Sequence, residues 1–407
     1  MGTPSLARTA PRREEWIDRA APFLALLAWL TPLVVITVGL LRRPGSRSLD
    51  PIYRWATEAW SAQATLYTDS NGFIYLPTFI PIYWPFAVLH VPWGEVLWRS
   101  IAAAGMAHAL WSLMELVPRA RSARGFLLLS IACLPVSLGA LQMGQANAWI
   151  AMALFQAAAS MARGQLWRTA AWLSLGFAIK PIVISAIGLA AIREVRLVPR
   201  LIILCGLWLV LPYLLGPAVY VTSQYEAALG TITGSCATVT EHRFADINGL
   251  LRSFIGTELS GNWSHGVRAG AGLALALAVL LSGRKLSPKN WALIWLTLSA
   301  CYLLLFNPMT EANSYCMLSV PAALLAWEWL GRGESPAEPR RTRFLATGWA
   351  TIVLLVLMGG ASEIARPWAG NSLDLWFFPS CAICAIFVAM IRLINPTTPP
   401  SFEGTRN

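Results

Sequence analysis

Residues 22–41 read PFLALLAWLTPLVVITVGLL, a run without a single charged side chain. Such a run is long enough to cross the roughly 30 Å hydrocarbon core of a bilayer as one helix. It is too long for the core of a signal peptide, and no small-residue cleavage site follows it. We therefore expect residues 20–41 to form a retained first transmembrane helix.

A similar composition extends along the whole chain. Of its 407 residues, 56% are hydrophobic and only 13% are charged, whereas a soluble domain carries about 25% charged residues. Apolar runs of about 18 residues or more recur from end to end. The sequence therefore predicts an all-α multi-pass membrane protein, a single integral membrane domain over residues 1–407 with about 12 transmembrane segments. We expect these segments at 20–41, 97–117, 125–142, 145–162, 169–180, 181–192, 198–216, 267–283, 290–306, 313–330, 344–361 and 375–393.

Two of these segments, 169–180 and 181–192, are too short to cross the bilayer as straight helices. They meet at Lys180 and Pro181, and proline disfavours the continuation of a helix through its own position. We interpret them as two half-length helices that meet at a break. A single span over both would place the basic stretch REVRLVPR outside and invert all later segments.

The net charge of +11 follows the predicted topology. With the N-terminus in the cytoplasm, 21 of the 31 Lys and Arg residues lie in inner segments, as the positive-inside rule requires. The charge therefore indicates orientation in the cytoplasmic (inner) membrane, with both termini cytoplasmic, and no nucleic-acid partner. Two long segments, 42–96 and 216–266, then lie outside. The region 331–407 contains C-terminal spans of unassigned role.

Several kinds of functional site lack support in the sequence. The seven cysteines lie mainly inside apolar runs and show no metal-ligand spacing, so we expect no disulfide framework, metal or cofactor. There is no Gly-rich phosphate loop and no Ser-His-Asp order, which disfavours nucleotide binding and triad hydrolysis. The polar residues that are not basic loop markers gather instead in the outer segments, where we expect the active site.

The first outer segment contains a predicted interfacial helix, DPIYRWATEAWSAQATL at 50–66. Its apolar residues recur at helical spacing, and its tryptophans suit the membrane interface. Asp50 would be the N-cap of this helix and Pro51 a first-turn residue. Two interpretations stay open: Asp50 is only a cap, or it is also a carboxylate held rigidly at the membrane rim. The apolar face comprises Ile52, Trp55, Ala56, Ala59 and Trp60.

The next stretch, FIYLPTFIPIYWPFAVLHVPW at 73–93, contains four prolines and many aromatic residues. The prolines exclude one regular helix, so we expect a short interfacial or re-entrant piece that leads to the next span. The aromatic residues are typical of interfacial anchors. A path for a lipid chain is the alternative.

Lys180 has an unfavourable insertion free energy at its predicted position. A lysine inside a membrane segment costs roughly 2.5–3.5 kcal/mol on insertion scales, less if it snorkels to the interface. One interpretation is therefore a snorkelling lysine. The other is a fixed cation that faces an aqueous cavity and suits a phosphate group.

Three further outer stretches carry polar groups. MGQANAW at 143–149 places Gln145 and Asn147 at a tight turn, where amides commonly bind backbone groups. FNPMTEANSY at 306–315 holds more polar residues than a simple turn needs, although a capped helix start would use some of them. In the long outer segment, Arg243 and Arg252 could bind an anion or be solvated.

Together these stretches resemble glycosyltransferase family 87, the polyprenol-phosphate-sugar-dependent mannosyltransferases with the GT-C membrane fold. The resemblance rests on an ordered set of local patterns between about Asp50 and Tyr315. These are the aspartate ahead of ATEAWSAQATLY, the stretch FIYLPTFIPIYWPF, and then GQAN, LSLGFAIKP, INGLLRSF and NPMTEANSY. The stretch NPMTEANSY departs from the family pattern: family members often carry a histidine in this loop, whereas here the loop contains Glu311 and Asn313 and no histidine.

The resemblance implies a GT-C-type architecture and an outer-face active site. The donor would be a polyprenyl-phosphate-linked sugar, mannose or another hexose, and the acceptor a hydroxyl on a lipid or glycan, with inversion at the anomeric carbon. Asp50 would be the general base, and Glu311 would bind a sugar hydroxyl or assist proton transfer. Lys180, then Arg252 and Arg243, would offset the leaving phosphate. The expected substrate-binding residues are Tyr75, Gln145, Asn147, Asn248, Asn307, Asn313 and Tyr315.

Two other classes of protein share part of this pattern. A transporter or flippase of lipid-linked sugars would also have many spans and a broken helix pair. Such transporters contain repeated halves and sites near the membrane midplane, whereas here no convincing halves occur and the polar clusters lie on one face. A non-catalytic assembly subunit would not need Asp50, Lys180 and Glu311 to converge. We therefore expect an enzyme.

Overall fold

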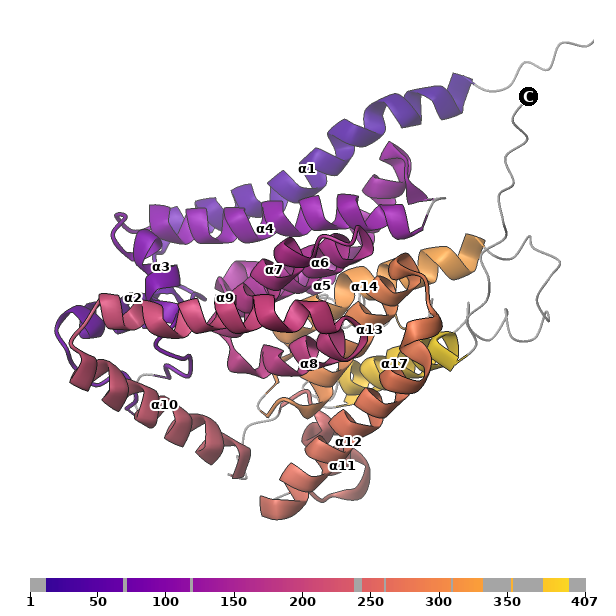
Figure 1. Ribbon diagram of the computed structural model, residues 1–407. Coiled ribbons are helices and arrows are strands. Elements are labelled where there is room, and N and C mark those ends of the chain that lie inside the picture. The colour runs from indigo at the N-terminus through magenta and orange to yellow at the C-terminus, as the bar shows by residue number, and fades with distance from the viewer. Residues whose placement is uncertain are drawn as a thin grey trace, which may run out of the picture.

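The structure, a computed structural model, describes residues 12–68, 72–117, 120–237, 244–259, 261–308, 310–331, 353 and 376–394 (Figure 1). Within these ranges every regular element is a helix and no strand occurs. The α-helices are α1 (Arg12–Arg42), α2 (Asp50–Ser61), α3 (Phe79–Ala87), α4 (Trp93–Leu113), α5 (Ala123–Met143), α6 (Ala146–Ala162), α7 (Leu166–Ile179), α8 (Ile184–Arg193), α9 (Val198–Val210), α10 (Ala218–Ala237), α11 (Ile247–Ile255), α12 (Gly261–Ser282), α13 (Pro288–Phe306), α14 (Cys316–Gly331) and α17 (Phe378–Ile394).

Long helices form the body of the molecule. In Figure 1, α1, α4 and α9 run along its length, the short helices α2 and α3 lie at one end, and the first turn of α1 lies at the other. Five stretches in the described ranges are long and apolar enough to cross a membrane. They are Arg19–Arg42, Ala123–Met143, Val195–Leu214, Gly261–Lys285 and Pro288–Phe306. The chain thus has the helices of a membrane protein.

Eleven of the predicted segments coincide with these helices within a few residues, because a long apolar run is the sequence signal for each. The remaining one, 344–361, lies outside the described residues except for Val353. The segment 216–266, predicted as a long outer loop, contains two helices, α10 and α11. One side of α10 packs on the body through Val221, Gln224 and Ala228, a helical spacing interrupted by a polar residue.

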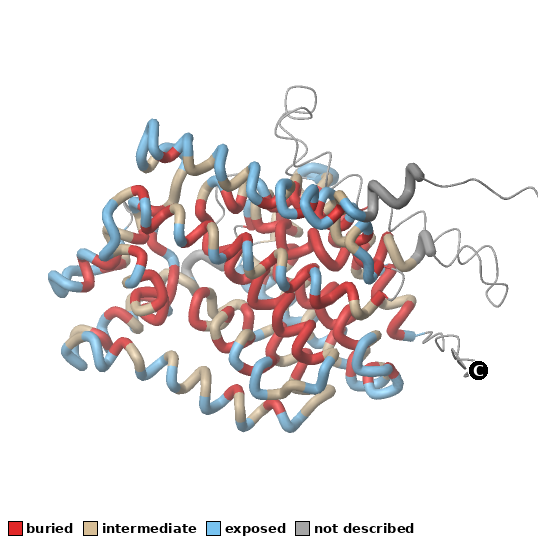
Figure 2. The backbone as a smooth tube through the Cα atoms, turned by 90° about the horizontal axis from the view of Figure 1, so that it is seen from above, coloured by how far each residue is buried: buried red, intermediate tan, exposed pale blue. Residues whose placement is uncertain are grey.

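Helix α6 forms the centre of the bundle. Every residue from Ala146 to Met161 is buried, and α4, α7, α13 and α14 pack around it. Its many alanines allow neighbouring backbones to approach closely. Figure 2 shows the buried residues concentrated in the interior and the exposed ones at the periphery.

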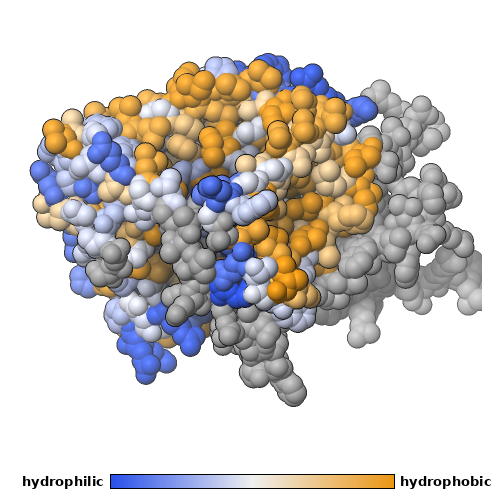
Figure 3. Space-filling view, turned by 90° about the horizontal axis from the view of Figure 1, so that it is seen from below, coloured by the Kyte–Doolittle hydropathy of each residue, from blue (hydrophilic) through white to orange (hydrophobic). Residues whose placement is uncertain are grey.

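The peripheral helices expose apolar side chains instead of polar ones. In the most apolar window of Arg19–Arg42 and of Val195–Leu214, 17% of the residues are buried, against 78% in Pro288–Phe306. Apolar surface also covers much of the face in Figure 3. A large exposed apolar surface is unfavourable in water but favourable against lipid tails, so these helices fit a bilayer environment.

The stretch 73–93 was expected to anchor aromatic residues in the membrane interface, and this was wrong for most of them. The prolines do confine the helix to the nine residues of α3. However, Tyr75, Phe79, Tyr83 and Phe86 are buried, because α3 packs between α2 and α4. Their rings lie against Tyr53 or Trp98 at centroid distances of 4.9–6.1 Å.

Candidate active site

The turn between α5 and α6 is the centre of the candidate site. Gly144 ends α5 in the left-handed region, with φ of 61°, which favours glycine. The turn is held from two sides: Trp98 Nε1 donates to the Gly144 carbonyl (2.9 Å), and the Leu49 N–H donates to the Met143 carbonyl (2.9 Å). Arg99 also bonds to the last carbonyls of α5, at Leu141 and Gln142. The residues that follow are therefore rigidly placed.

Gln145 and Asn147 connect this turn to the distant stretch 306–315. Gln145 Nε2 donates to Glu311 Oε2 (2.5 Å), and Asn147 Nδ2 donates to Ser314 Oγ (2.8 Å). Both amides are buried, whereas Glu311 is exposed. Two turns that the sequence analysis identified separately thus form one polar cluster.

Lys180 joins the same cluster from the helix break. Helix α7 ends at Ile179, Lys180 is extended (φ −138°, ψ 122°), and a short 3-10 turn at Pro181–Val183 leads into α8, so the predicted break is confirmed. Lys180 Nζ donates to Asn147 Oδ1 (3.0 Å) and lies over the Tyr75 ring, 5.5 Å from its centroid. Among the described residues, no carboxylate forms an ion pair with Lys180.

Two tyrosines complete the cluster. Tyr53 and Tyr75 share a hydrogen bond between their hydroxyls (3.0 Å), and the Tyr53 oxygen accepts from the Ala146 N–H (3.2 Å). Burial raises the pKa of Tyr53 to about 12, so its hydroxyl stays protonated at neutral pH. These phenols can therefore orient a ligand or a neighbouring group but do not supply a base.

Asp50 is not the N-cap that the sequence analysis predicted. Helix α2 already includes Asp50, because the Leu49 carbonyl accepts the first helical bonds from Ile52 and Tyr53, and Leu49 is the N-cap without a side-chain bond. The Asp50 carboxylate is instead buried, with 4% of the residue exposed. It accepts hydrogen bonds from Arg54 Nε (2.8 Å) and from the Tyr83 hydroxyl.

The predicted convergence of three charged residues is thus observed for two of them. Lys180 and Glu311 bond to neighbouring amides, Asn147 and Gln145. Asp50 lies one turn of α2 away from Tyr53, with no bond to either charged residue. Tyr53 connects the two groups, since its ring is 5.0 Å from the ring of Tyr83.

The remaining predicted residues make contacts outside the polar cluster. Arg252 pairs with Glu258, and Asn248 exchanges two hydrogen bonds with the backbone of Leu259. The Tyr315 hydroxyl donates to the Ala245 carbonyl (3.0 Å) and is fully buried.

Three other predicted residues differ in their surroundings. Asn307 is the C-cap of α13, and the Asn313 amide donates to Met143 Sδ. Arg243 lies outside the described residues. Within the described ranges, no three His, Cys, Asp or Glu side chains lie together as metal ligands would.

The sequence analysis missed three groups that shape the site: Tyr53, Ser314 and Arg54. Arg54 Nη1 donates to the Ala87 and Leu89 carbonyls, so it joins Asp50 to the end of α3. Its place four residues after Asp50 is the spacing of a helical ion pair, a signal present in the sequence. Tyr53 follows Asp50 by three residues and shares its helix face, but nothing local indicates its contact with Tyr75.

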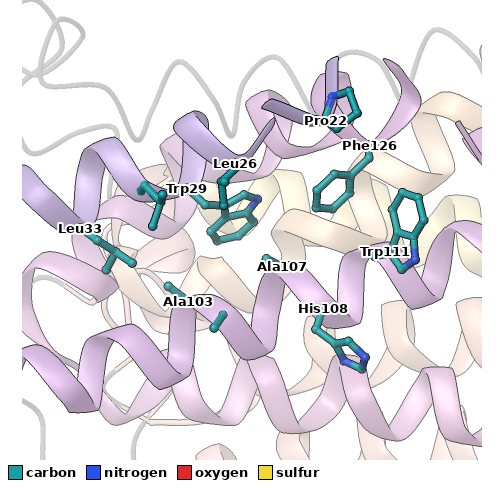
Figure 4. A pocket seen from close by; sticks show the side chains of 11 residues that line it. Pro22, Leu26, Trp29, Leu33, Ala103, Ala107, His108, Trp111 and Phe126 are labelled. Carbon is teal, nitrogen blue, oxygen red and sulfur yellow. The ribbon is translucent and has the colours of Figure 1, made fainter. Parts of the chain in front are cut away.

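A separate cavity of about 460 Å³ opens between α1, α4 and α5 (Figure 4). Its lining is almost entirely apolar, with Trp29, Trp111 and Phe126 among the larger side chains, and His108 is its only titratable residue. None of the residues of the polar cluster lines it. The cavity is therefore distinct from the candidate site.

Comparison with protein families decides the class of this protein. A family model of glycosyltransferase family 87 matches residues 73–308, more than half of the chain. The chain belongs to glycosyltransferase family 87. As a family 87 member with membrane-type helices, it is a membrane glycosyltransferase. No curated protein and no solved structure matched the chain in the corresponding searches.

The family 87 match covers only part of the candidate site. It includes Tyr75, the turn with Gln145 and Asn147, and Lys180. It begins after Asp50 and ends before Glu311. The family match therefore assigns no role to these two acids.

Proposed function

We propose that this family 87 enzyme moves a sugar, mannose or another hexose, from a polyprenyl-phosphate donor to a hydroxyl of a lipid or glycan acceptor. The reaction would take place at the outer face of the cytoplasmic membrane, in a GT-C-type architecture. The positive-inside distribution of Lys and Arg supports this orientation. The polar cluster lies at the turn after α5, which bonds through Met143 to Leu49 in the segment that follows α1, and this supports the location.

Lys180 is the observation that carries the proposal. Its ammonium group lies at a break between two membrane helices and is held by an amide and an aromatic ring, without a carboxylate partner among the described residues. A cation in such a place is costly unless an anion binds there. The phosphate of a lipid donor is an anion that reaches this depth, and its charge grows as the bond to the sugar breaks.

The reaction needs one bond to form and one to break. The acceptor oxygen attacks the anomeric carbon, the bond from that carbon to the phosphate oxygen breaks, and polyprenyl phosphate leaves with the bonding electron pair. The acceptor proton passes to a carboxylate, for which we propose Asp50. Arg54 and Tyr83 fix the orientation of this carboxylate. Direct displacement of this kind inverts the anomeric centre.

Glu311 is the second candidate for the base, and its exposure favours it. Within the described ranges only Oε2 of Glu311 accepts a hydrogen bond, from Gln145, so the other oxygen is available to a substrate hydroxyl. Asp50, in contrast, has donors on both oxygens. In the proposed scheme Glu311 binds a sugar hydroxyl, and exchange of the two roles is the alternative that mutation separates.

Donor selectivity tests the proposal. Purified protein in lipid nanodiscs is given a radiolabelled polyprenyl-phosphate hexose or the matching nucleotide hexose, together with a membrane-lipid extract as acceptor. We expect labelled product and free polyprenyl phosphate from the lipid donor alone. Transfer from the nucleotide sugar alone would contradict the proposal. So would movement of the intact lipid donor across the bilayer without cleavage, as a flippase would cause.

A further inference from the structure

Helix α12 places an arginine on its packed face. Ser264, Leu275 and Val279 are the buried residues of this helix, and Arg268 lies on the same side, four residues after Ser264. Its neighbours Val267 and Ala269 are exposed. Arg268, which is half-buried, therefore lies on the side of α12 that packs on the protein.

The polar atoms on this face have no partner in the part of the chain that the structure describes. Arg268 Nε and Nη1 are buried and form no hydrogen bond. The same holds for the hydroxyl of Ser264, which is fully buried. Residues four apart on a helix are neighbours, so these donors face one small region.

Arg268 lies at the end of the molecule that contains Glu311. The Tyr302 hydroxyl donates to the Arg268 carbonyl (3.0 Å), and Tyr302 is in the last turns of α13, just before the loop that leads to Glu311. At the opposite end, Arg193 Nε of α8 donates to the Gly283 carbonyl after α12 (2.9 Å). At the helical rise per residue, Lys180 lies about 20 Å from that bond along α8, and Arg268 lies about 20 Å from it along α12. The two cations are therefore at a similar depth.

Two buried guanidinium nitrogens without a partner in the described ranges require an explanation. Desolvation of a cation inside a membrane protein is costly, and such residues face a partner or a ligand. A snorkelling side chain would extend its nitrogens to water, whereas two nitrogens of Arg268 are buried. A guanidinium with an adjacent hydroxyl presents several N–H and O–H donors, the chemistry that binds phosphate oxygens.

We propose that Arg268 and Ser264 bind the phosphate of a polyprenyl phosphate, as a second anion-binding position besides Lys180. This inference rests on the proposed function, because it assigns further donor-binding residues to the same reaction. The two cations would then approach the phosphate from different helices. Their combined charge would match the dianionic leaving group better than that of a single lysine.

Equilibrium binding tests the inference. Full-length protein in nanodiscs is titrated with a short-chain polyprenyl phosphate, the matching uncharged polyprenol and inorganic phosphate, followed by tryptophan fluorescence. We expect Arg268→Gln to weaken polyprenyl-phosphate binding about tenfold or more, with polyprenol binding unchanged. Arg268→Lys, which keeps the charge, should lose less. Ser264→Ala, the mildest change, should weaken polyprenyl-phosphate binding about fivefold.

A matched control is Arg200→Gln in α9. Arg200 also has a buried Nε without a partner in the described ranges, but it belongs to the basic segment at the other end of the molecule. This variant should bind both lipids as the wild type does. If Arg268→Gln and Ser264→Ala bind polyprenyl phosphate as tightly as the wild type does, whereas Lys180→Met binds it more weakly, the inference is overturned and the proposed function stays intact.

Two other outcomes are separable. If the wild type binds polyprenol as tightly as polyprenyl phosphate, the proposed function fails and this inference fails with it. If inorganic phosphate binds as tightly as the lipid, the site is one for free phosphate, and the assignment to a lipid ligand is overturned.

Discussion

Asp50 and Glu311 are two carboxylates in different surroundings. Asp50 is buried and accepts hydrogen bonds from Arg54 and Tyr83, which fix the orientation of its carboxylate. Glu311 is exposed and accepts from Gln145. A general base needs access to the reacting proton as well as a fixed orientation. The structure supplies orientation to Asp50 and access to Glu311, so the two must be compared directly.

The Asp50→Asn variant should lose catalysis while the protein still folds. Asparagine can accept from Arg54 but cannot take a proton, so we expect the rate of polyprenyl-phosphate release to fall at least about 100-fold. The measurement is the initial rate at saturating donor, with detergent-solubilised yield as a check on folding. Glu58→Gln, at an exposed position of the same helix, is the matched control and should be fully active.

Glu311→Gln completes this comparison. If Glu311 only binds a sugar hydroxyl, Glu311→Gln should reduce the rate less than Asp50→Asn does. An active Asp50→Asn enzyme beside an inactive Glu311→Gln enzyme would transfer the role of base to Glu311.

At the level of residues, the sequence indicated which side chains are unusual but not which side chains they contact. Lys180 could be singled out because a lysine beside a proline inside apolar helices is unusual. The contact between Gln145 and Glu311 could not be predicted, since 166 residues separate them and either turn alone suits local bonds. The N-cap assignment of Asp50 was wrong by one residue, because Leu49 can begin the helix while the Asp50 N–H bonds to Ser48.

Among the elements, the turn after α5 depends on glycine in two ways. Gly144 has a positive φ, and a Cβ there would lie 2.8 Å from Arg99 Cζ. Arg99 cannot move aside easily, because its guanidinium is buried and bonds to Glu95, Ser48 and the end of α5. A larger residue at this position therefore disturbs the turn that places Gln145.

Gly144→Ala should therefore be more destabilising than Gly→Ala at a position that has the same positive φ but no close neighbour at the Cβ position. We expect a loss of about 3 kcal/mol in the free energy of unfolding, from left-handed strain plus overpacking. Gly164→Ala is the control, since Gly164 has φ of 68° with nothing within 4 Å of its Cβ position, and it should lose about 1 kcal/mol. Thermal unfolding in detergent compares them, and equal losses would contradict this reading of the turn.

The helix break at Lys180 has its own supporting contact. Proline at 181 interrupts the helical bonds, and the hydroxyl of Thr78 donates to the Ala178 carbonyl near the end of α7 (2.5 Å). Both groups are buried. The segment before α3 thus stabilises the position from which Lys180 extends.

Thr78→Val should cost about 1–2 kcal/mol of unfolding free energy, because it leaves a buried carbonyl without this donor. Thr297→Val is the matched change, since the Thr297 hydroxyl donates to Leu293, a carbonyl four residues back within the same helix. That variant should change the unfolding free energy by less than about 0.5 kcal/mol. Chemical denaturation in mixed micelles measures both, and an equal effect would show that the Thr78 bond is unimportant.

The helices themselves followed from the sequence better than their surroundings did. Long apolar runs predicted α1, α5 and α13 closely. Helix α10 was missed, because its packed face includes Gln224 and its other faces mix polar and apolar residues. The aromatic residues of α3 looked like interfacial anchors because composition alone cannot tell a lipid-facing ring from one packed on Tyr53 and Trp98.

At the scale of the whole molecule, the orientation of the bundle decides which side of the membrane the polar cluster faces. The exposed apolar helices surround a buried centre, and the polar cluster lies at one end. The distribution of Lys and Arg predicts that this end faces outward.

Cysteine labelling tests that orientation. A cysteine at exposed Gln63, after α2, should react with a membrane-impermeant maleimide in intact cells. A cysteine at exposed Lys289, at the start of α13, should react only after lysis. The opposite pattern would invert the proposed topology and place the cluster in the cytoplasm.

The most direct test of the account measures the donor dependence of Lys180 variants. Initial rates of sugar transfer are determined against polyprenyl-phosphate hexose concentration for the wild type, Lys180→Arg and Lys180→Met. If Lys180 binds the donor phosphate, Lys180→Met should lower kcat/KM for the donor about 100-fold, and Lys180→Arg, which keeps the charge, should retain more activity. An unchanged kcat/KM for the donor in Lys180→Met would contradict the account.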